Sequence, residues 1–191
     1  MRSVLCSCGD EVAQTSEPLS TDTLARFAPD ILVSYGYRHI LRRDIVDRYT
    51  PNIYNLHISL LPWNRGSDPN FWSFFDDTPK GVTLHCIDHG VDTGTSSPRN
   101  SFFSGTETLA SSYARLQEAI ETLFTNAWPR LRTGALAGGP QHGTGSTHRA
   151  CDKEVFMAEL PLGWETPVSV VEAMGRRHRS CALGASKETC R

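Results

Sequence analysis

Apolar positions along the chain fall first into short, dense runs. The runs at 30–36 (DILVSYG), 52–62 (NIYNLHISLLP) and 80–88 (KGVTLHCID) are continuous or only partly alternating, which is typical of strands buried in a sheet. The stretches 20–29 and 42–51 precede the first two runs and each ends at a proline, so we predict two short helices there. Strands that alternate with helices predict an α/β fold with an open, Rossmann-like, mostly parallel sheet and flanking helices.

A helical stripe of apolar residues follows in the second half of the chain. Its members are spaced alternately four and three residues apart, as on one face of a helix. They are Leu109, Tyr113, Leu116, Ile120, Leu123 and Ala127. Thr106 is the predicted start and Gly134 the predicted stop, so we expect a long helix packed on the sheet.

Shorter segments carry weaker patterns. Residues 10–15 (DEVAQT) and 100–105 (NSFFSG) are predicted as short strands, and residues 71–77 (FWSFFDD) as a short aromatic helix. The polar, glycine-rich stretch 134–149 is predicted to be a loop, and 154–169 is predicted to hold a short strand and a docked segment.

The chain is therefore expected to have three parts. Residues 1–133 form the sheet-containing unit, and residues 134–172 form the glycine-rich loop with a docked C-terminal segment. Residues 173–191 are predicted to be a disordered tail, because the sequence from Gly175 onward has no apolar periodicity that would fix it to a core.

Composition argues against several classes of protein. The 191 residues are 39% hydrophobic and carry a formal net charge of -2, which is not the strongly basic balance of a nucleic-acid binder. No apolar run is long enough to cross a membrane, and the N-terminus has no secretory pattern. The 6 cysteines match no zinc-binding spacing, so we expect free thiols and a cytoplasmic location.

Polar residues within the run at 52–62 are the first candidates for chemistry. Side chains two apart along a strand point to the same side, so Asn55, His57 and Ser59 share one face. Burying them costs free energy unless partners or a function require them. A lone histidine in a strand is more often structural, but a polar triplet beside a glycine-containing loop favours a site. Asp92, in a turn after the next strand, is the candidate carboxylate that would orient the imidazole.

Two longer motifs contain these residues. NLHISLLPWNRG at 55–66 and KGVTLHCIDHGVDTG at 80–94 contain Asn-x-His-x-Ser-Leu-Leu-Pro, Arg-Gly, Gly-Val-Thr-x-His and Asp-x-Gly in that order. The combination resembles the 10-formyltetrahydrofolate-dependent formyltransferase family, including the short sugar-nucleotide N-formyltransferases and the catalytic domain of methionyl-tRNA formyltransferase. The resemblance covers roughly residues 10 to 133, so residues 1–133 are expected to be an N-terminally shortened formyltransferase-like catalytic domain.

The resemblance implies a catalytic trio of Asn55, His57 and Asp92. In such a reaction an amine attacks the formyl carbon of the folate, and the oxyanion that forms needs hydrogen-bond donors fixed in advance. The Asn55 amide and a protonated His57 would supply these donors. His57 would also shuttle the proton of the amine, while Asp92 would orient the ring and favour its charged form.

The resemblance also implies where the cosubstrate, 10-formyltetrahydrofolate, binds. The folate pocket of the family corresponds here to two segments, whose apolar side chains line the pterin slot and whose backbone groups bind the pterin edge. They comprise Arg38, His39, Ile40, Leu41, Cys86, Ile87, Asp88, His89, Gly90 and Val91. No metal is implied, although His85, His89 and Asp88 by composition alone could suggest one.

The acceptor is expected to be a small amine, first of all a nucleotide-linked amino sugar. The implied acceptor-binding residues are Ser59, Trp63, Asn64, Arg65 and Gly66. Phe71 and Trp72 would extend a stacking floor, or simply pack the fold. Transfer RNA comes second, because the chain has neither room for a tRNA-binding domain nor a basic surface, and glycinamide ribonucleotide comes third. The sequence is also compatible with a homodimer.

Three features depart from the family pattern. The first strand and its glycine-containing loop have no counterpart before residue 10, and the arginine-rich C-terminal stretch is unlike the family. Ser-Ser-Pro at 96–98 interrupts the strand expected after Asp-x-Gly. A sheet without its first strand exposes unpaired backbone, so a folate-binding remnant without catalysis is a further interpretation.

Overall fold

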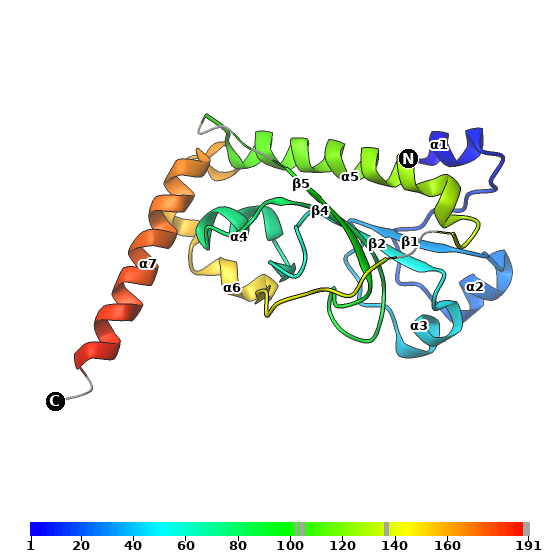
Figure 1. Cartoon of the computed structure of the whole chain (residues 1–191), viewed down its shortest axis with the longest axis horizontal. Helices are drawn as coiled ribbons and strands as arrows, with labels where there is room; N and C mark the ends of the chain where they lie inside the picture. Colours follow the sequence, from blue (N-terminus) through cyan, green and yellow to red (C-terminus); the bar gives the residue numbers. More distant parts are fainter. Residues whose placement is uncertain (102, 104–105, 136–137, 189–191) are drawn as a thin grey trace.

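The fold combines one mixed sheet with helices on both of its faces (Figure 1). The computed structural model describes residues 1–101, 103, 106–135 and 138–188. The strands of the main sheet are, in spatial order, β1 (Leu32–Tyr35), β2 (Ile53–His57), β4 (Gly81–Cys86) and β5 (Ser96–Asn100). The first three coincide with the predicted apolar runs, and the α/β class is confirmed.

Among the described strands of this sheet, the parallel neighbours are β1 and β2. β2 and β4 run antiparallel, as do β4 and β5, so the expectation of a mostly parallel sheet holds only for the first pair. The difference arises in the connection from β2 to β4. Its helix α4 (Pro69–Phe75) packs beside the sheet against α7 (Val168–Glu188) instead of crossing the sheet face, so the chain re-enters the sheet at the end where β2 leaves it (Figure 1).

Helices cover both faces of the sheet. α1 (Arg2–Ser7) and α5 (Leu109–Leu131) lie over one face, and α2 (Thr21–Phe27) and α3 (Arg43–Tyr49) lie over the other (Figure 1). The predicted helices at 20–29 and 42–51 are therefore confirmed. α2 begins after Ser20, whose side chain caps the first turn as its residue type predicts.

α5 carries the predicted apolar stripe. Leu116 and Ile120 are buried in the main cluster of apolar residues, which also contains residues of β2 and β4. The helix begins after Thr108 rather than at Thr106, because Thr108 and Ser111 exchange the reciprocal hydrogen bonds of a capping box.

The strand predicted at 10–15 is wrong. These residues are irregular, and Val12 packs against the main cluster without pairing to a neighbour in the sheet. Asp10 ties the segment down, because its carboxylate accepts the indole N–H of Trp128 at 2.7 Å. The described residues before β1 therefore contribute helices but no strand to the sheet.

The strand predicted at 100–105 begins earlier, at Ser96, and residues 102, 104 and 105 lie outside the described residues. Ser-Ser-Pro does not interrupt this strand. Pro98 is tolerated because β5 is the edge of the sheet, where a missing N–H removes no ladder hydrogen bond.

A second apolar cluster lies beside the sheet around α4, whose residues are all buried. The chain that leads to it after the glycine-rich loop consists of α6 (Ala150–Glu154), η1 (Met157–Glu159) and η2 (Gly163–Glu165). The short strand predicted at 154–169 is wrong, because this stretch forms short helical turns and only a single bridge, between Pro167 and Thr108. The docked segment is confirmed, because Phe156 and Leu160 pack against the second cluster.

Residues 173–188 belong to α7, so the disordered tail expected there is not observed, while 189–191 lie outside the described residues. Val168, Val171 and Met174 are spaced three apart and are buried against α4. This apolar periodicity begins before residue 173. Residues 173–191 taken alone therefore show no apolar periodicity. In the described part of the chain, neither α7 nor any other helix is long and apolar enough to span a bilayer.

A small parallel sheet joins β3 (Arg65–Gly66) to β6 (Thr147–His148). β3 lies in the turn after β2, and β6 lies at the end of the glycine-rich segment 134–149. The pairing places this segment against the turn after β2, which carries the predicted acceptor-binding residues Trp63 to Gly66.

Candidate active site

A polar cluster lies on the face of the sheet near the carboxyl end of β2. β2 and β4 pair in a register that puts Asn55 opposite His85, with 3.2 Å between Asn55 Nδ2 and His85 Nε2. His57, two residues further along β2, shares this face with Asn55, as their spacing predicts. The sheet itself therefore groups an amide and two imidazoles.

Asp92 joins this cluster from the loop between β4 and β5. Its Oδ1 accepts a hydrogen bond from Asn55 Nδ2 at 3.1 Å and lies 3.2 Å from His85 Nε2. Its Oδ2 accepts the Gly66 backbone N–H at 2.8 Å and lies 3.7 Å from His57 Nδ1. The fold thus brings together Asn55, His57 and Asp92, which are remote from one another in sequence.

The surroundings of Asp92 favour its charged form. Burial by itself would raise the pKa of this carboxyl group. The hydrogen bond from His85, the nearby His57 and the Gly66 N–H together outweigh burial and hold the pKa of Asp92 well below its usual range. Asp92 is therefore a carboxylate at neutral pH.

His57 is only 7% exposed, and each of its ring nitrogens faces a different group. Nε2 lies 3.1 Å from the Asn64 carbonyl oxygen, which can only accept, so Nε2 carries a hydrogen. Burial lowers the pKa of His57, and the Asp92 carboxylate opposes this shift only in part. Asp92 thus favours the charged form, as expected, but burial outweighs it. The ring is therefore neutral at neutral pH, which differs from the protonated His57 that was expected.

The turn after β2 is held by buried hydrogen bonds. The Ser59 hydroxyl donates to the Trp63 carbonyl at 2.7 Å and closes the turn. Asn64 is fully buried, and its backbone N–H donates to Ser146 Oγ at 2.9 Å while its side-chain Nδ2 donates to Thr78 Oγ1 at 2.8 Å. These contacts fix the Asn64 carbonyl that faces His57.

Gly66 occupies a position that other residues cannot take. Its φ is 87°, and a Cβ there would lie 2.2 Å from the backbone oxygen of His148 in β6. Only glycine therefore lets the chain pair with β6 and aim the backbone N–H at Asp92.

The glycine-rich segment also contacts the loop that carries Asp92. Gln141 Nε2 donates to the backbone carbonyls of Asp92, at 2.7 Å, and Gly94, at 3.0 Å. Its Oε1 accepts from the Arg65 guanidinium at 2.7 Å. One side chain therefore links the turn after β2 to the loop after β4.

Comparison with known proteins shows which family this chain belongs to. Residues 10–126 match the formyl transferase family. The formyltransferase PseJ from Anoxybacillus kamchatkensis, solved with UDP-4,6-dideoxy-4-formamido-L-AltNAc and tetrahydrofolate, is 44% identical with a TM-score of 0.87, over 91% of this chain and 93% of that chain. The chain belongs to the formyl transferase family.

More distant formyltransferases share less of the chain. An N-formyltransferase from Helicobacter canadensis, solved with folinic acid and dTDP-3-aminofucose, is 25% identical with a TM-score of 0.59, over 64% of this chain and 46% of that one. Methionyl-tRNA formyltransferase from Clostridium thermocellum is 17% identical with a TM-score of 0.62, over 78% of this chain and 65% of that one, a likeness of fold alone. The family resemblance drawn from the two motifs is confirmed.

Sequence reasoning missed two residues around the site of this formyltransferase. His85 stands in the Gly-Val-Thr-x-His motif, and the pairing of β4 with β2 gives it a place beside Asn55. Gln141 has no comparable signal, because it lies in a polar loop without a motif. Within the described residues, no group of three or more His, Cys, Asp and Glu side chains is arranged to hold a metal.

The two segments predicted to bind the cosubstrate of this formyltransferase both contact the cluster of apolar residues to which α3 contributes Ile45 and Tyr49. Leu41, just before α3, and Ile87, just after β4, pack against the same buried cluster. His89 Nε2 lies 2.8 Å from Asp47 Oδ1 of α3, so the loop after β4 is anchored to this helix. Arg38, His39, Asp88 and Gly90 are exposed on these segments, and Cys86 is half-buried.

The predicted acceptor-binding residues divide by burial. Ser59 and Asn64 are buried and hold the turn, whereas Trp63, Arg65 and Gly66 are half-buried. The suggested stacking floor is core. Phe71 and Trp72 are 2% and 4% exposed, and the Trp72 ring stacks on His148 with 4.0 Å between ring centres.

Proposed function

We propose that this protein transfers a formyl group from 10-formyltetrahydrofolate to the primary amine of a nucleotide-linked amino sugar. The observation that carries the proposal is the 44% identity to a formyltransferase crystallised with a formamido sugar nucleotide and tetrahydrofolate. Those two molecules are the products of such a transfer, since the sugar nitrogen bears the formyl group that the folate lacks. The cluster of Asn55, His57 and Asp92 supplies groups suited to this chemistry.

The proposed reaction forms one bond and breaks one. The amine nitrogen attacks the formyl carbon, and the carbonyl oxygen becomes an oxyanion. The bond between the formyl carbon and the folate nitrogen then breaks, and the carbonyl re-forms. The proton lost by the amine ends on the folate nitrogen, so atoms and electrons balance without a further reactant.

His57 is proposed to carry this proton. With its hydrogen on Nε2 directed at the Asn64 carbonyl, the neutral ring has its lone pair on Nδ1. A base that is uncharged at working pH can accept the proton of the attacking amine and return it to the leaving nitrogen. The Asp92 carboxylate, 3.7 Å from Nδ1, stabilises the imidazolium that forms in between.

Asn55 is proposed to stabilise the oxyanion. One hydrogen on its Nδ2 is held by Asp92 Oδ1. The second faces His85 Nε2, 3.2 Å from Nδ2, and is proposed to be shared with the formyl oxygen. An amide fixed in this way needs no reorganisation as charge develops on the formyl oxygen. Removing one such donor from an enzyme costs on the order of 100- to 1000-fold in kcat.

The cosubstrate is proposed to bind along residues 38–41 and 86–91. Ile40 is 94% exposed and Val91 is 55% exposed, and apolar side chains in such open positions are suited to cover a flat ring. The acceptor is proposed to contact Trp63, Arg65 and Gly66 in the turn after β2. The Arg65 guanidinium suits the phosphates of a nucleotide-linked sugar.

A formylation assay tests the proposal. The purified protein is incubated with 10-formyltetrahydrofolate and UDP-linked 4-amino-4,6-dideoxy-L-AltNAc, and mass spectrometry follows the gain of one CO unit on the sugar nucleotide. We expect turnover by the wild type and a loss of at least about 100-fold in kcat for His57→Ala. His142→Ala, which removes an exposed histidine, is the control and is expected to keep wild-type turnover.

Two results would contradict the proposal. Formylation of methionyl-tRNA but of no amino-sugar nucleotide would assign the chain to the tRNA-dependent activity instead. Binding of folinic acid in isothermal titration without turnover of any amine would make the chain a folate-binding remnant.

A further inference from the structure

The segment 138–148, here called the strap, is fixed at both of its ends. At one end Gly139 exchanges two backbone hydrogen bonds with Ser96 at the start of β5, at 2.9 and 3.1 Å. At the other end β6 pairs with β3 in the turn after β2. The strap therefore bridges the loop after β4, which carries Asp92, and the turn after β2, whose Asn64 carbonyl contacts His57, and the residues between its ends are held in place.

Gln141 uses all of its polar atoms to join these loops. Its Nε2 donates to the backbone carbonyls of Asp92 and Gly94, and its Oε1 accepts from Arg65 Nε at 3.2 Å and Nη2 at 2.7 Å. Asp92 has a φ of 53°, which is unfavourable for a residue with a side chain. The backbone needs external contacts to stay in that conformation, and Gln141 supplies two at the point of strain.

Ser146 acts on the other loop. Its hydroxyl accepts the Asn64 backbone N–H at 2.9 Å and donates to Asn64 Oδ1 at 3.1 Å. Its backbone N–H donates to the Pro62 carbonyl at 3.2 Å, and its carbonyl accepts the Arg65 N–H at 2.9 Å. Asn64 is thus clamped from two sides, and its carbonyl is kept 3.1 Å from His57 Nε2.

We propose that Gln141 and Ser146 are positioning residues for formyl transfer, a role that rests on the proposed function. Gln141 holds the backbone of Asp92 so that its carboxylate faces His57. Ser146, acting through Asn64, keeps the hydrogen of the imidazole on Nε2 and leaves the lone pair on Nδ1. The strap thereby sets both the position of the carboxylate and the tautomer of the base.

A purely structural strap would behave differently. Substitutions in such a strap would lower the free energy of unfolding. The molecules that remain folded would nevertheless keep the wild-type tautomer of His57 and the wild-type pH dependence of turnover. The measurements must therefore be made on the ring and on the kinetics, not on stability alone.

Nitrogen chemical shifts of labelled histidines give the first test and need no substrate. In the wild type we expect the His57 signals of a neutral ring with hydrogen on Nε2. In Ser146→Ala we expect a mixture of both tautomers, because the Asn64 carbonyl is no longer clamped. Thr144→Ala, an exposed position in the same strap, is the matched control and is expected to match the wild type. Wild-type tautomer signals in folded Ser146→Ala would overturn the role of Ser146, whatever the formylation assay shows.

Kinetics of Gln141 variants give the second test. Gln141→Glu keeps the shape and the contact to Arg65 but loses both donors to the Asp92 loop, whereas Gln141→Ala loses everything. We expect kcat to fall by up to about 100-fold in both, the cost of a displacement of about 1 Å, with KM nearly unchanged. The limb of the pH profile that reports His57 should also move to lower pH. Two charged or titratable side chains face the ring: Asp92 raises the pKa of His57 and His85 lowers it, so a displaced Asp92 leaves the pKa lower.

Two kinetic outcomes would overturn the role of Gln141. Wild-type kcat in Gln141→Glu with a low kcat in Gln141→Ala would show that only the Arg65 contact matters. A lower kcat with an unmoved pH profile would show that the position of Asp92 relative to His57 had not changed. If the wild type formylates no acceptor, the proposed function fails, while the tautomer measurement still decides whether the strap positions the ring.

Discussion

At the scale of single residues, burial decides the state of the imidazole at the centre of the site. His57 sits 3.7 Å from a carboxylate, an arrangement that alone would raise its pKa, yet desolvation lowers it further than Asp92 raises it. In the proposed reaction the residue therefore starts as a base, and charge appears on it only when the amine gives up its proton. Asp92 matters most at that moment, since it lowers the energy of the charged ring.

The pH dependence of turnover follows from this state. Because His57 must be neutral to accept a proton, we expect kcat/KM to rise with pH through a midpoint below the ordinary value of about 6.5. Asp92→Asn removes the charge that opposes burial, so the midpoint should move to still lower pH while kcat drops. Steady-state rates from acid to neutral pH measure both effects. A midpoint above the ordinary histidine value would contradict the assignment of His57 as a buried neutral base.

The charge of Asp92 also couples stability to pH. A carboxyl group whose pKa is lowered by folding stabilises the native state above its unfolded pKa, and this contribution is lost as pH falls toward the lower, folded pKa. We expect Asp92→Asn to cost roughly 2 kcal/mol near neutral pH, and the difference from wild type to shrink once pH falls below about 4. Urea unfolding at both pH values measures this. A difference that does not depend on pH would show that Asp92 acts through its shape rather than its charge.

The site was predictable from sequence where spacing along one strand decides it. Asn55 and His57 are two apart on β2 and must share a face, and the motif that contains Asp92 marks that residue. His85 depends on the register between two strands, and Gln141 depends on where a loop crosses others. Neither the register between strands nor the crossing of loops leaves a periodic pattern in the sequence. These contacts could therefore be identified only from the structure.

At the scale of elements, the contact between α7 and α4 rests on the absence of a side chain. Gly175 is buried in α7, and a Cβ there would lie 1.7 Å from the backbone oxygen of Phe75 in α4. The same oxygen accepts a hydrogen bond from the Arg179 guanidinium. The two helices can therefore approach closely only where glycine leaves room for the carbonyl.

Replacing this glycine tests the contact. In an exposed helix Gly→Ala would stabilise by about 1 kcal/mol, whereas here we expect Gly175→Ala to destabilise by roughly 1–3 kcal/mol, because the backbone of α4 must shift. Urea unfolding followed by far-ultraviolet circular dichroism measures the change. Ser169→Ala, at an exposed position of α7, is the control and should leave the midpoint almost unchanged. A gain in stability for Gly175→Ala would mean that α7 can move away from α4 without cost.

The elements themselves were largely predictable, but their directions and ends were not. The runs that became β1, β2 and β4 are dense in apolar residues, and that density reflects burial rather than the identity of the neighbouring strand. Whether β4 runs parallel or antiparallel to β2 depends on where α4 packs, a contact with α7 far along the chain. Local pattern therefore fixes the type of an element, and distant packing fixes its direction.

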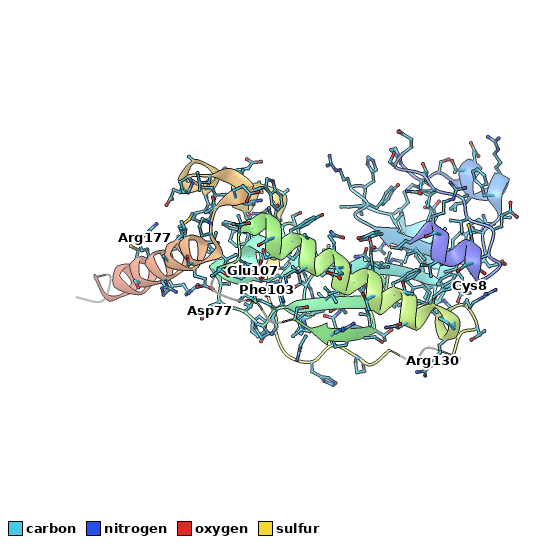
Figure 2. The ribbon with its side chains drawn as sticks, turned by 90° about the horizontal axis from the view of Figure 1, so that it is seen from above. Cys8, Asp77, Phe103, Glu107, Arg130 and Arg177 are labelled. Atoms are coloured by element: carbon cyan, nitrogen blue, oxygen red, sulfur yellow. The ribbon has the colours of Figure 1, made fainter. Side chains whose placement is uncertain are left out.

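At the scale of the whole molecule, one helix connects two apolar clusters. Leu116 of α5 belongs to the cluster around the sheet, and Leu109, at the start of the same helix, belongs to the cluster around α4 and α7. Phe103 packs against both clusters, and Figure 2 shows it beside Glu107 at the start of α5, with Arg130 toward the other end. The strap makes a second connection through β3 and β6. We therefore expect the clusters to unfold together.

Phe103→Ala tests whether the two clusters act as one. Hydrogen exchange gives the free energy of opening for the slowest amides of β4 in one cluster and of α4 in the other. In the wild type we expect these values to agree. In Phe103→Ala we expect the value for β4 to fall by roughly 2 kcal/mol, less than for a fully buried phenylalanine. The value for α4 should fall further, so that α4 opens before β4, because its cluster loses part of its link to the sheet. Phe27→Ala, at a phenylalanine that is 55% exposed on α2, is the control and should leave both values near wild type. If α4 already opens before β4 in the wild type, then α5 and Phe103 do not couple the clusters, and the site would rest on the sheet and the strap without support from α4 and α7.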